Sequence, residues 1–194
     1  LDMWLDVNGQ KRQRGNTKTM IFDSRYIVWC CSQYFVLEPG DVIITGTPSW
    51  SEYWAPTIAE LPATREVIVA DRPGFRTSEP EDAVRDLAKQ ADALAPMLRA
   101  REGQRVLLVG QSFGAPVATL MAQRYPDQVD AIVLVSAYFG DRGPTARRMF
   151  GAGRMLQGVL SRDLRNSISE VTAQTEQLPA VWTALRGLQQ PIVF

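Results

Sequence analysis

The chain has 194 residues, of which 45% are hydrophobic, and this is enough to bury one full core with room for a small appendage. Its 21 Lys and Arg balance its 21 Asp and Glu, so no net field favours nucleic acid, an anionic membrane or an acidic partner. The longest apolar stretch, residues 26–37, is too short to cross a bilayer, and the N-terminus lacks the pattern of a secretion signal. We therefore expect a cytoplasmic globular protein, with its oligomeric state left open.

The first forty residues are predicted to form an appendage of a β-hairpin and a helix. Asn8-Gly9 favours the type I′ turn of a hairpin, and residues 24–37 form a mostly apolar helix candidate followed by a turn. The only cysteines, Cys30 and Cys31, are adjacent, which suits neither a disulfide framework nor the spacing of a zinc site. We interpret them as buried structural thiols.

From residue 41 onward, short apolar runs alternate with helical patterns, which is typical of an α/β fold with a mostly parallel sheet flanked by helices. An amphipathic helix with apolar positions from Ala83 to Leu98 is predicted between the second and third strands, opened by a capping box at residues 78–81. The predicted strands are residues 42–45, 66–70, 105–109, 131–135 and 191–194.

Residues 141–188 interrupt this alternation with scattered helical stretches and no convincing strand, so they are predicted to form a helical cap. The sequence thus predicts two parts, an N-terminal segment of residues 1–40 and an α/β domain of residues 41–194. Asp71 and Arg72, which follow the second strand, are interpreted as charges that anchor a turn.

Gly110-Gln-Ser-Phe-Gly114 follows the third strand and precedes a helical stretch at residues 116–125. This strand, tight turn and helix is the pattern of a nucleophile elbow, in which Ser112 would be the nucleophile. Such a serine needs a base to take its proton, yet the chain contains no histidine. A lysine serves as base in some enzymes, but Lys11, Lys18 and Lys89 have no sequence reason to reach Ser112.

From about residue 45 onward the chain resembles the α/β-hydrolase family, through Gly46-Thr-Pro48, Ala70-Asp-Arg-Pro-Gly-Phe75 and Gly110-Gln-Ser-Phe-Gly114. The resemblance implies an oxyanion hole made by the backbone N–H groups of Phe113 and Thr47. Two positions depart from the family pattern: Thr45 stands where histidine is usual, and Arg76 stands where glycine is usual.

Further site residues follow from the same resemblance. It offers Asp141 as the acid of the catalytic triad, and a surface or cap-anchoring role is the alternative for this residue. Trp54, with its neighbours Trp50 and Tyr53, is a candidate for substrate binding in an acyl pocket, and plain packing is the alternative.

The first fifty residues resemble the C-terminal third of the fumarylacetoacetate hydrolase family, through Val7-Asn-Gly9, Gly15-Asn-Thr17 and the run Leu37-Glu-Pro-Gly-Asp-Val-Ile-Ile-Thr-Gly-Thr-Pro48. That family uses a divalent metal, and the resemblance implies substrate contacts for Gly46 and Thr47. Its metal-binding carboxylates belong upstream of this segment, and no Glu-x-Glu pair precedes Asp41. We assign no metal ligands and no cofactor.

The two resemblances overlap at residues 41–48, which suggests a chimera joined within one strand. By descent we expect a serine hydrolase of small-molecule carboxylic esters or amides, weakly active or inactive because it lacks histidine. Two alternatives stay open: a non-catalytic ligand-binding or scaffold protein, and a metal-dependent subunit of the fumarylacetoacetate hydrolase type.

Overall fold

The computed structural model describes residues 2–7, 10–16, 40–61, 67–98, 105–140, 144–155 and 157–194, and the chain divides into two compact units, Leu1–Val36 and Leu37–Phe194. In the first unit, strands β1 (Asp2–Val7) and β2 (Gln10–Asn16) pair antiparallel, where the sequence predicts a hairpin. The Asn8-Gly9 turn, the predicted helix at residues 24–37 and both cysteines lie outside the described residues.

The second unit is built on a sheet of five parallel strands in the order β4-β3-β5-β6-β7. Ile43 of the central β3 pairs with Val69 of β4 on one side and with Val109 of β5 on the other. The fold class predicted from the apolar runs is confirmed. The strands are β3 (Asp41–Ile44), β4 (Val67–Ala70), β5 (Val106–Gln111), β6 (Val129–Val135) and β7 (Ile192–Val193).

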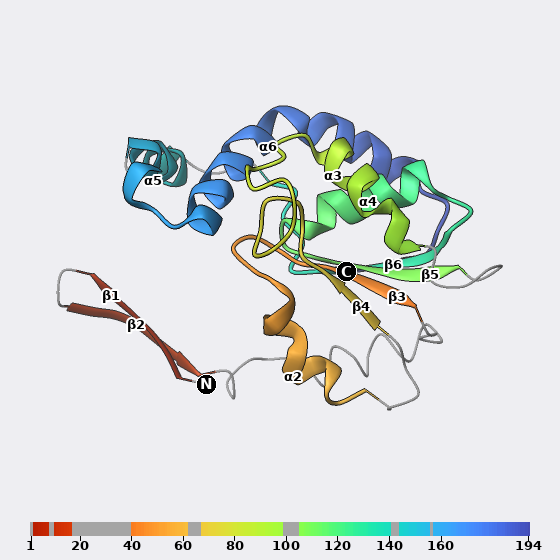
Figure 1. The fold of residues 1–194 in the computed structure, drawn as a ribbon, viewed down its shortest axis with the longest axis horizontal. Helices are drawn as coiled ribbons and strands as arrows, with labels where there is room; N and C mark the ends of the chain where they lie inside the picture. Colours follow the sequence, from red (N-terminus) through yellow and green to blue (C-terminus); the bar gives the residue numbers. More distant parts are fainter. Residues whose placement is uncertain are drawn as a thin grey trace. The chain divides into compact units, whose positions relative to one another are not determined.

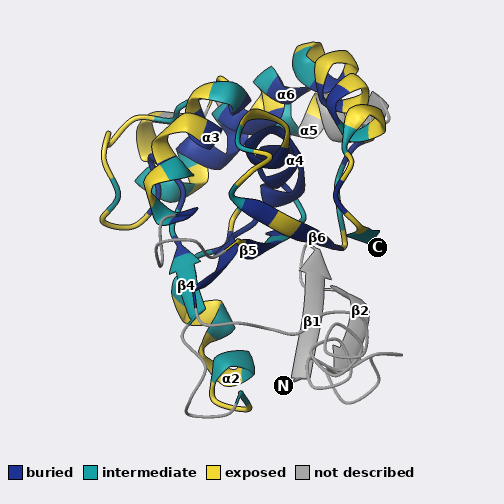
Figure 2. Cartoon of the chain, turned by 90° about the vertical axis from the view of Figure 1, so that its right-hand side faces the viewer, coloured by how far each residue is buried: buried dark blue, intermediate teal, exposed yellow. Residues whose placement is uncertain are grey.

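Helices α3 (Leu87–Leu94), α4 (Gly114–Arg124) and α6 (Arg162–Gly187) lie on one side of the sheet, and α2 (Ala55–Ile58) lies toward the other (Figure 1). Every residue of α4 from its first glycine to Ala122 is buried, which Figure 2 shows as a dark helix above the strands. Because α4 contacts the sheet, α3 and α6, it has almost no face left for solvent.

The start of α3 differs from the prediction. The helix begins at Leu87, where the side chain of Asp86 accepts hydrogen bonds from the N–H groups of Ala88 (2.9 Å) and Lys89 (3.2 Å). The capping box predicted at residues 78–81 is wrong, since the Ser78 hydroxyl donates instead to the carbonyl oxygen of Asp71 at 2.9 Å. Asp86 supplies the N-cap itself, so the helix needs no earlier start.

After β6 come α5 (Pro144–Met155), a 3-10 turn at Gln157–Val159 and the 26-residue helix α6. The second half of α6 belongs to the main core, because Val181 and Ala184 are fully buried and lie in one apolar cluster with residues of α4. The first half of α6 lies beside α5 (Figure 1). No helix in the described ranges has the length and apolarity needed to span a membrane.

Candidate active site

The turn between β5 and α4 places Ser112 in an unusual backbone conformation. Its φ of +48° lies in the left-handed region, which L side chains seldom adopt. The Ser112 N–H donates to the carbonyl oxygen of Val135 at 2.8 Å, and the Ser112 carbonyl accepts from Ala115 (3.1 Å) and Tyr138 (3.2 Å). Hydrogen bonds to β6, α4 and the loop after β6 therefore hold the turn.

Two glycines allow the elements around this turn to approach each other. A β carbon on Gly114 would lie 2.4 Å from the carbonyl oxygen of Ile44, and one on Gly110 would lie 2.7 Å from the Cα of Ala115. Both distances are shorter than van der Waals contact, so only glycine fits. The glycines of the sequence motif thus set how closely α4 packs against β3 and β5.

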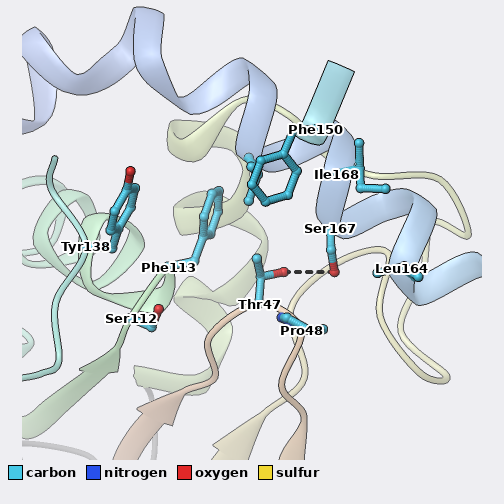
Figure 3. Close-up of a pocket in the computed structure, with 10 residues that line it drawn as sticks. Thr47, Pro48, Ser112, Phe113, Tyr138, Phe150, Leu164, Ser167 and Ile168 are labelled. Carbon is cyan, nitrogen blue, oxygen red and sulfur yellow. Dashed lines mark hydrogen bonds between the residues drawn. The ribbon is translucent and has the colours of Figure 1, made fainter. Parts of the chain in front are cut away.

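A cavity of about 360 Å³ opens beside Ser112, at the carboxyl ends of β3 and β5 (Figure 3). Its far wall comes from α5 and from the first half of α6, so segments distant in sequence close over the serine. None of the lining side chains that the structure describes is charged. They are Thr47, Pro48, Ser112, Phe113, Tyr138, Phe150, Leu164, Ser167, Ile168 and Val171.

Three of the predicted site residues meet at this cavity: Thr47, Ser112 and Phe113. Gly46 lies against the serine as well, because a β carbon on Gly46 would be 3.1 Å from the β carbon of Ser112. The structure therefore brings the end of β3 and the turn after β5 together, as two buried parallel neighbours require.

The other predicted site residues lie elsewhere. Trp54 ends a 3-10 turn at Ser51–Trp54 and is not among the residues that line the cavity. Trp50, directly before that turn, packs on Tyr53, with ring centroids 4.9 Å apart. Lys89 is exposed on α3. Asp141 falls outside the described residues.

Thr47 and Phe113, whose backbone N–H groups are the predicted oxyanion donors, both line the cavity. In the part of the chain that the structure describes, neither the Phe113 N–H nor the Thr47 N–H is hydrogen-bonded to another protein group. The neighbouring Gly46 N–H is already engaged, since it donates to the side-chain oxygen of Gln111 at 3.2 Å. Two unengaged donors beside a serine hydroxyl are the arrangement that stabilises an oxyanion.

Sequence reasoning missed a buried ion pair behind the cavity. Arg72 and Glu170 are both fully buried, and Nη1 of Arg72 lies 2.8 Å from Oε1 and 2.9 Å from Oε2 of Glu170. Burial raises the pKa of the Glu170 carboxyl, and the guanidinium opposes that rise. Of the two charges interpreted as turn anchors, Asp71 accepts from the Ser51 N–H at 2.6 Å, whereas Arg72 is the centre of this network. The partners are 98 positions apart, and no local pattern relates them.

Arg76, which stands where the family pattern has glycine, keeps a left-handed conformation with φ of +53°. Its guanidinium hydrogen-bonds to Glu52 and lowers the pKa of that carboxyl, and it lies 5.2 Å from the ring centroid of Trp50. The backbone N–H of Arg76 donates to Oδ1 of Asp163 at 3.3 Å. Position 76 therefore has the left-handed backbone conformation that glycine favours, although it carries an arginine side chain.

Because a left-handed backbone costs free energy at any residue with a β carbon, Arg76→Gly is expected to melt about 2–6 °C above Arg76→Ala. The alanine variant is the matched control, since both variants lose the contacts with Glu52 and Trp50 and differ only in the β carbon. Thermal unfolding followed by circular dichroism measures the difference. Equal melting temperatures would show that the turn is not strained.

In the described part of the chain, no three His, Cys, Asp or Glu side chains gather in a cluster suited to a metal ion.

A sequence model described as "alpha/beta hydrolase fold" matches residues 42–186, which is 145 of the 194 residues. The chain belongs to the α/β-hydrolase family. The matched range takes in β4, β5 and β6, nearly all of β3, the turn at Ser112 and almost all of the helices, whereas β7 lies beyond it.

Solved structures of other proteins share the fold at low sequence identity. E-2-(acetamidomethylene)succinate hydrolase is 19% identical with a TM-score of 0.61, over 80% of this chain and 71% of that one. The putative ancestral haloalkane dehalogenase AncHLD2 is 18% identical with a TM-score of 0.58, over 77% of this chain and 68% of that one. At these identities the likeness shows the fold alone.

The N-terminal segment of this α/β-hydrolase is similar to other proteins. It matches 2,4-didehydro-3-deoxy-L-rhamnonate hydrolase of Sphingomonas sp. (strain SKA58), at 56% identity over 48 residues. It also matches the mitochondrial oxaloacetate tautomerase FAHD1 of Bos taurus, at 52% identity over 48 residues. The match takes in 25% of this chain but only 17% and 22% of these relatives, so the chain spans a small part of their length.

Proposed function

We propose that this α/β-hydrolase descends from serine hydrolases of carboxylic esters or amides, and that the turn at Gly110–Gly114 is a nucleophile elbow carrying Ser112. The observation that supports this most strongly is the left-handed φ of +48° at Ser112 beside the N–H groups of Phe113 and Thr47. A strained backbone at a serine facing a cavity is typical of a functional position rather than of a simple turn.

The proposed chemistry is acyl transfer. Oγ of Ser112 attacks the carbonyl carbon of a substrate in the cavity, and the carbonyl oxygen gains negative charge between the two N–H groups. The bond from that carbon to the alcohol or amine then breaks, the leaving group takes up a proton, and water hydrolyses the resulting acyl-serine. The mostly aliphatic and aromatic lining suits a small, uncharged acyl group. The attack also requires a base to accept the proton of Ser112.

That base is the missing component. The chain has no histidine, and no lysine or carboxylate is among the described residues that line the cavity. We therefore propose that the chain by itself has little or no turnover. Oxyanion binding alone is expected to leave a residual acceleration of about 10³–10⁴ over water, far below that of a working esterase.

A fluorophosphonate probe tests the proposal, because it labels a nucleophilic serine through the same oxyanion geometry. We expect slow labelling of the wild-type chain and none of Ser112→Ala, measured by intact-mass spectrometry. Labelling that persists in Ser112→Ala would contradict the assignment. Measurable binding of small esters without any labelling would favour the alternative of a non-catalytic ligand-binding protein.

A metal-dependent activity of the fumarylacetoacetate hydrolase type is the second candidate. The observation that favours it is the 56% identity of the N-terminal segment to 2,4-didehydro-3-deoxy-L-rhamnonate hydrolase. Gly46 and Thr47 would then contact substrate. The expected sign is cleavage of a β-diketo acid that depends on added magnesium or manganese and stops with a chelator. Chelator-insensitive behaviour would remove this candidate.

We also propose that the chain is a chimera of the two families, because residues 41–48 satisfy both patterns. Genomic reads that cross residues 45–52 test the join directly. Reads that match only one of the two families on both sides of this strand would contradict it.

A further inference from the structure

We infer that Arg72 is a positioning residue that directs both oxyanion-hole N–H groups toward the cavity, and that Glu170 of α6 holds Arg72 in the required orientation. The inference rests on the proposed function, since it deepens the assignment of Thr47 and Phe113 as donors. It assigns a role to a fully buried charge that is not among the described residues lining the cavity.

The link from Arg72 to Thr47 is a single peptide group. The carbonyl of Gly46 and the N–H of Thr47 belong to the same planar unit, in which the C=O and N–H bonds point in opposite directions. Nη2 of Arg72 donates to the Gly46 carbonyl oxygen at 3.1 Å, and Nε donates to the Thr45 carbonyl oxygen at 2.9 Å. By holding the carbonyl on its own side, Arg72 turns the Thr47 N–H away from itself, and Thr47 lines the cavity.

The link from Arg72 to Phe113 is a stacking contact. The guanidinium carbon of Arg72 lies 4.7 Å from the ring centroid of Phe113 and 4.6 Å from that of Phe75. A guanidinium at such a distance from a ring face is attracted to it, more strongly when water is excluded. Arg72 and Phe113 are both buried, so the contact fixes the side chain next to the second donor.

Glu170 and Gln90 fix the guanidinium from the helix layer. Besides pairing with Glu170, Nη1 of Arg72 donates to Oε1 of Gln90 at 2.9 Å, and Nε2 of Gln90 donates to Oε1 of Glu170 at 2.7 Å. The Thr47 hydroxyl donates to Oε2 of Glu170 at 3.3 Å. The network therefore joins α3 and α6 to Thr47, which lines the cavity.

A buried ion pair is a poor device for stability alone. The desolvation of two charges offsets much of their attraction, and apolar replacements of similar volume are often as stable. The geometry found here uses the rigid fork of an arginine to reach two consecutive carbonyls and a carboxylate, which a lysine cannot do. That difference supplies the test.

Arg72→Lys keeps the charge and removes the fork. With imidazole present as base, we expect the second-order rate of Ser112 labelling by a fluorophosphonate to fall about 10- to 100-fold, because loss of one oxyanion donor costs roughly 10²–10³-fold. In ¹H–¹⁵N spectra we expect the Thr47 and Phe113 cross-peaks to shift while those of β6 stay in place. Arg124→Lys is the matched control, since Arg124 pairs with Asp92 on the surface, and it should change neither readout.

A purely structural role would lower the melting temperature without changing the labelling rate of the folded protein or moving these two amides, and that result would overturn the inference. If Arg72→Lys does not fold, Glu170→Gln replaces it, with the same shifts expected at Thr47 and Phe113; unchanged shifts would overturn the inference as well. If wild-type Ser112 is never labelled, the proposed function fails, and the amide shifts alone decide whether Arg72 positions the two N–H groups.

Discussion

Imidazole added to this protein is expected to increase its Ser112-dependent hydrolysis of p-nitrophenyl acetate by about 10- to 100-fold, since a positioned base contributes roughly 10²–10⁴-fold and a mobile one less. The physical reason is that the described residues lining the pocket include a candidate nucleophile and the two proposed N–H donors, and no histidine, lysine or carboxylate that could accept the proton. The cavity of about 360 Å³ is large enough to admit a free imidazole beside a small ester. Initial rates across a series of imidazole concentrations measure the effect.

Ser112→Ala is the essential control, because imidazole in solution cleaves the same ester. Only the excess of the wild-type rate over the variant rate counts as rescue. Equal rates for the two proteins at every imidazole concentration would show that Ser112 is not the nucleophile. Turnover typical of an esterase without any imidazole would show that some other group serves as the base.

Gly114→Ala is expected to destabilise the protein by about 3 kcal/mol or more, or to prevent folding. The new β carbon would lie 2.4 Å from the Ile44 carbonyl oxygen and 2.7 Å from that of Thr45, both rigid backbone atoms of the segment that leads to Thr47. The clash must push α4 away from β3, so the fluorophosphonate reactivity of Ser112 should be lost along with stability. Chemical denaturation measures the free energy of unfolding.

Gly151→Ala provides the matched control for this substitution. Gly151 lies in α5, and a β carbon there would meet nothing within 4 Å. Alanine should stabilise the helix by up to about 1 kcal/mol, because it loses less conformational freedom than glycine. If Gly114→Ala unfolds at the same denaturant concentration as wild type, the close approach of α4 to β3 does not constrain the fold.

Local sequence patterns predicted the sheet well. Each of its five strands lies within two residues of a continuous apolar run, because strands buried on both faces need side chains of one kind throughout. The start of α3 was less predictable. Ser78 and Asp86 are both residues that cap helices, and only the bond from Ser78 to the Asp71 carbonyl shows which one is free to do so.

Part of the candidate site was predicted from short motifs at the ends of strands. Thr47, Ser112 and Phe113 sit in short motifs that end neighbouring parallel strands, so their meeting at one edge of the sheet follows from the strand order. Trp54 is only a few residues from Thr47 in sequence, yet the 3-10 turn carries it away from the cavity. Proximity in sequence is a poor guide once the chain leaves a strand.

The sequence by itself determined the α/β class, the tight turn around Ser112 and the absence of an imidazole, because each depends on residues that are adjacent or on composition alone. Only the tertiary structure decided that α6 closes the cavity and that Glu170 meets Arg72 across 98 positions. Such contacts depend on how the helix layer packs over the sheet, and packing is set by the shapes of all the surrounding side chains together.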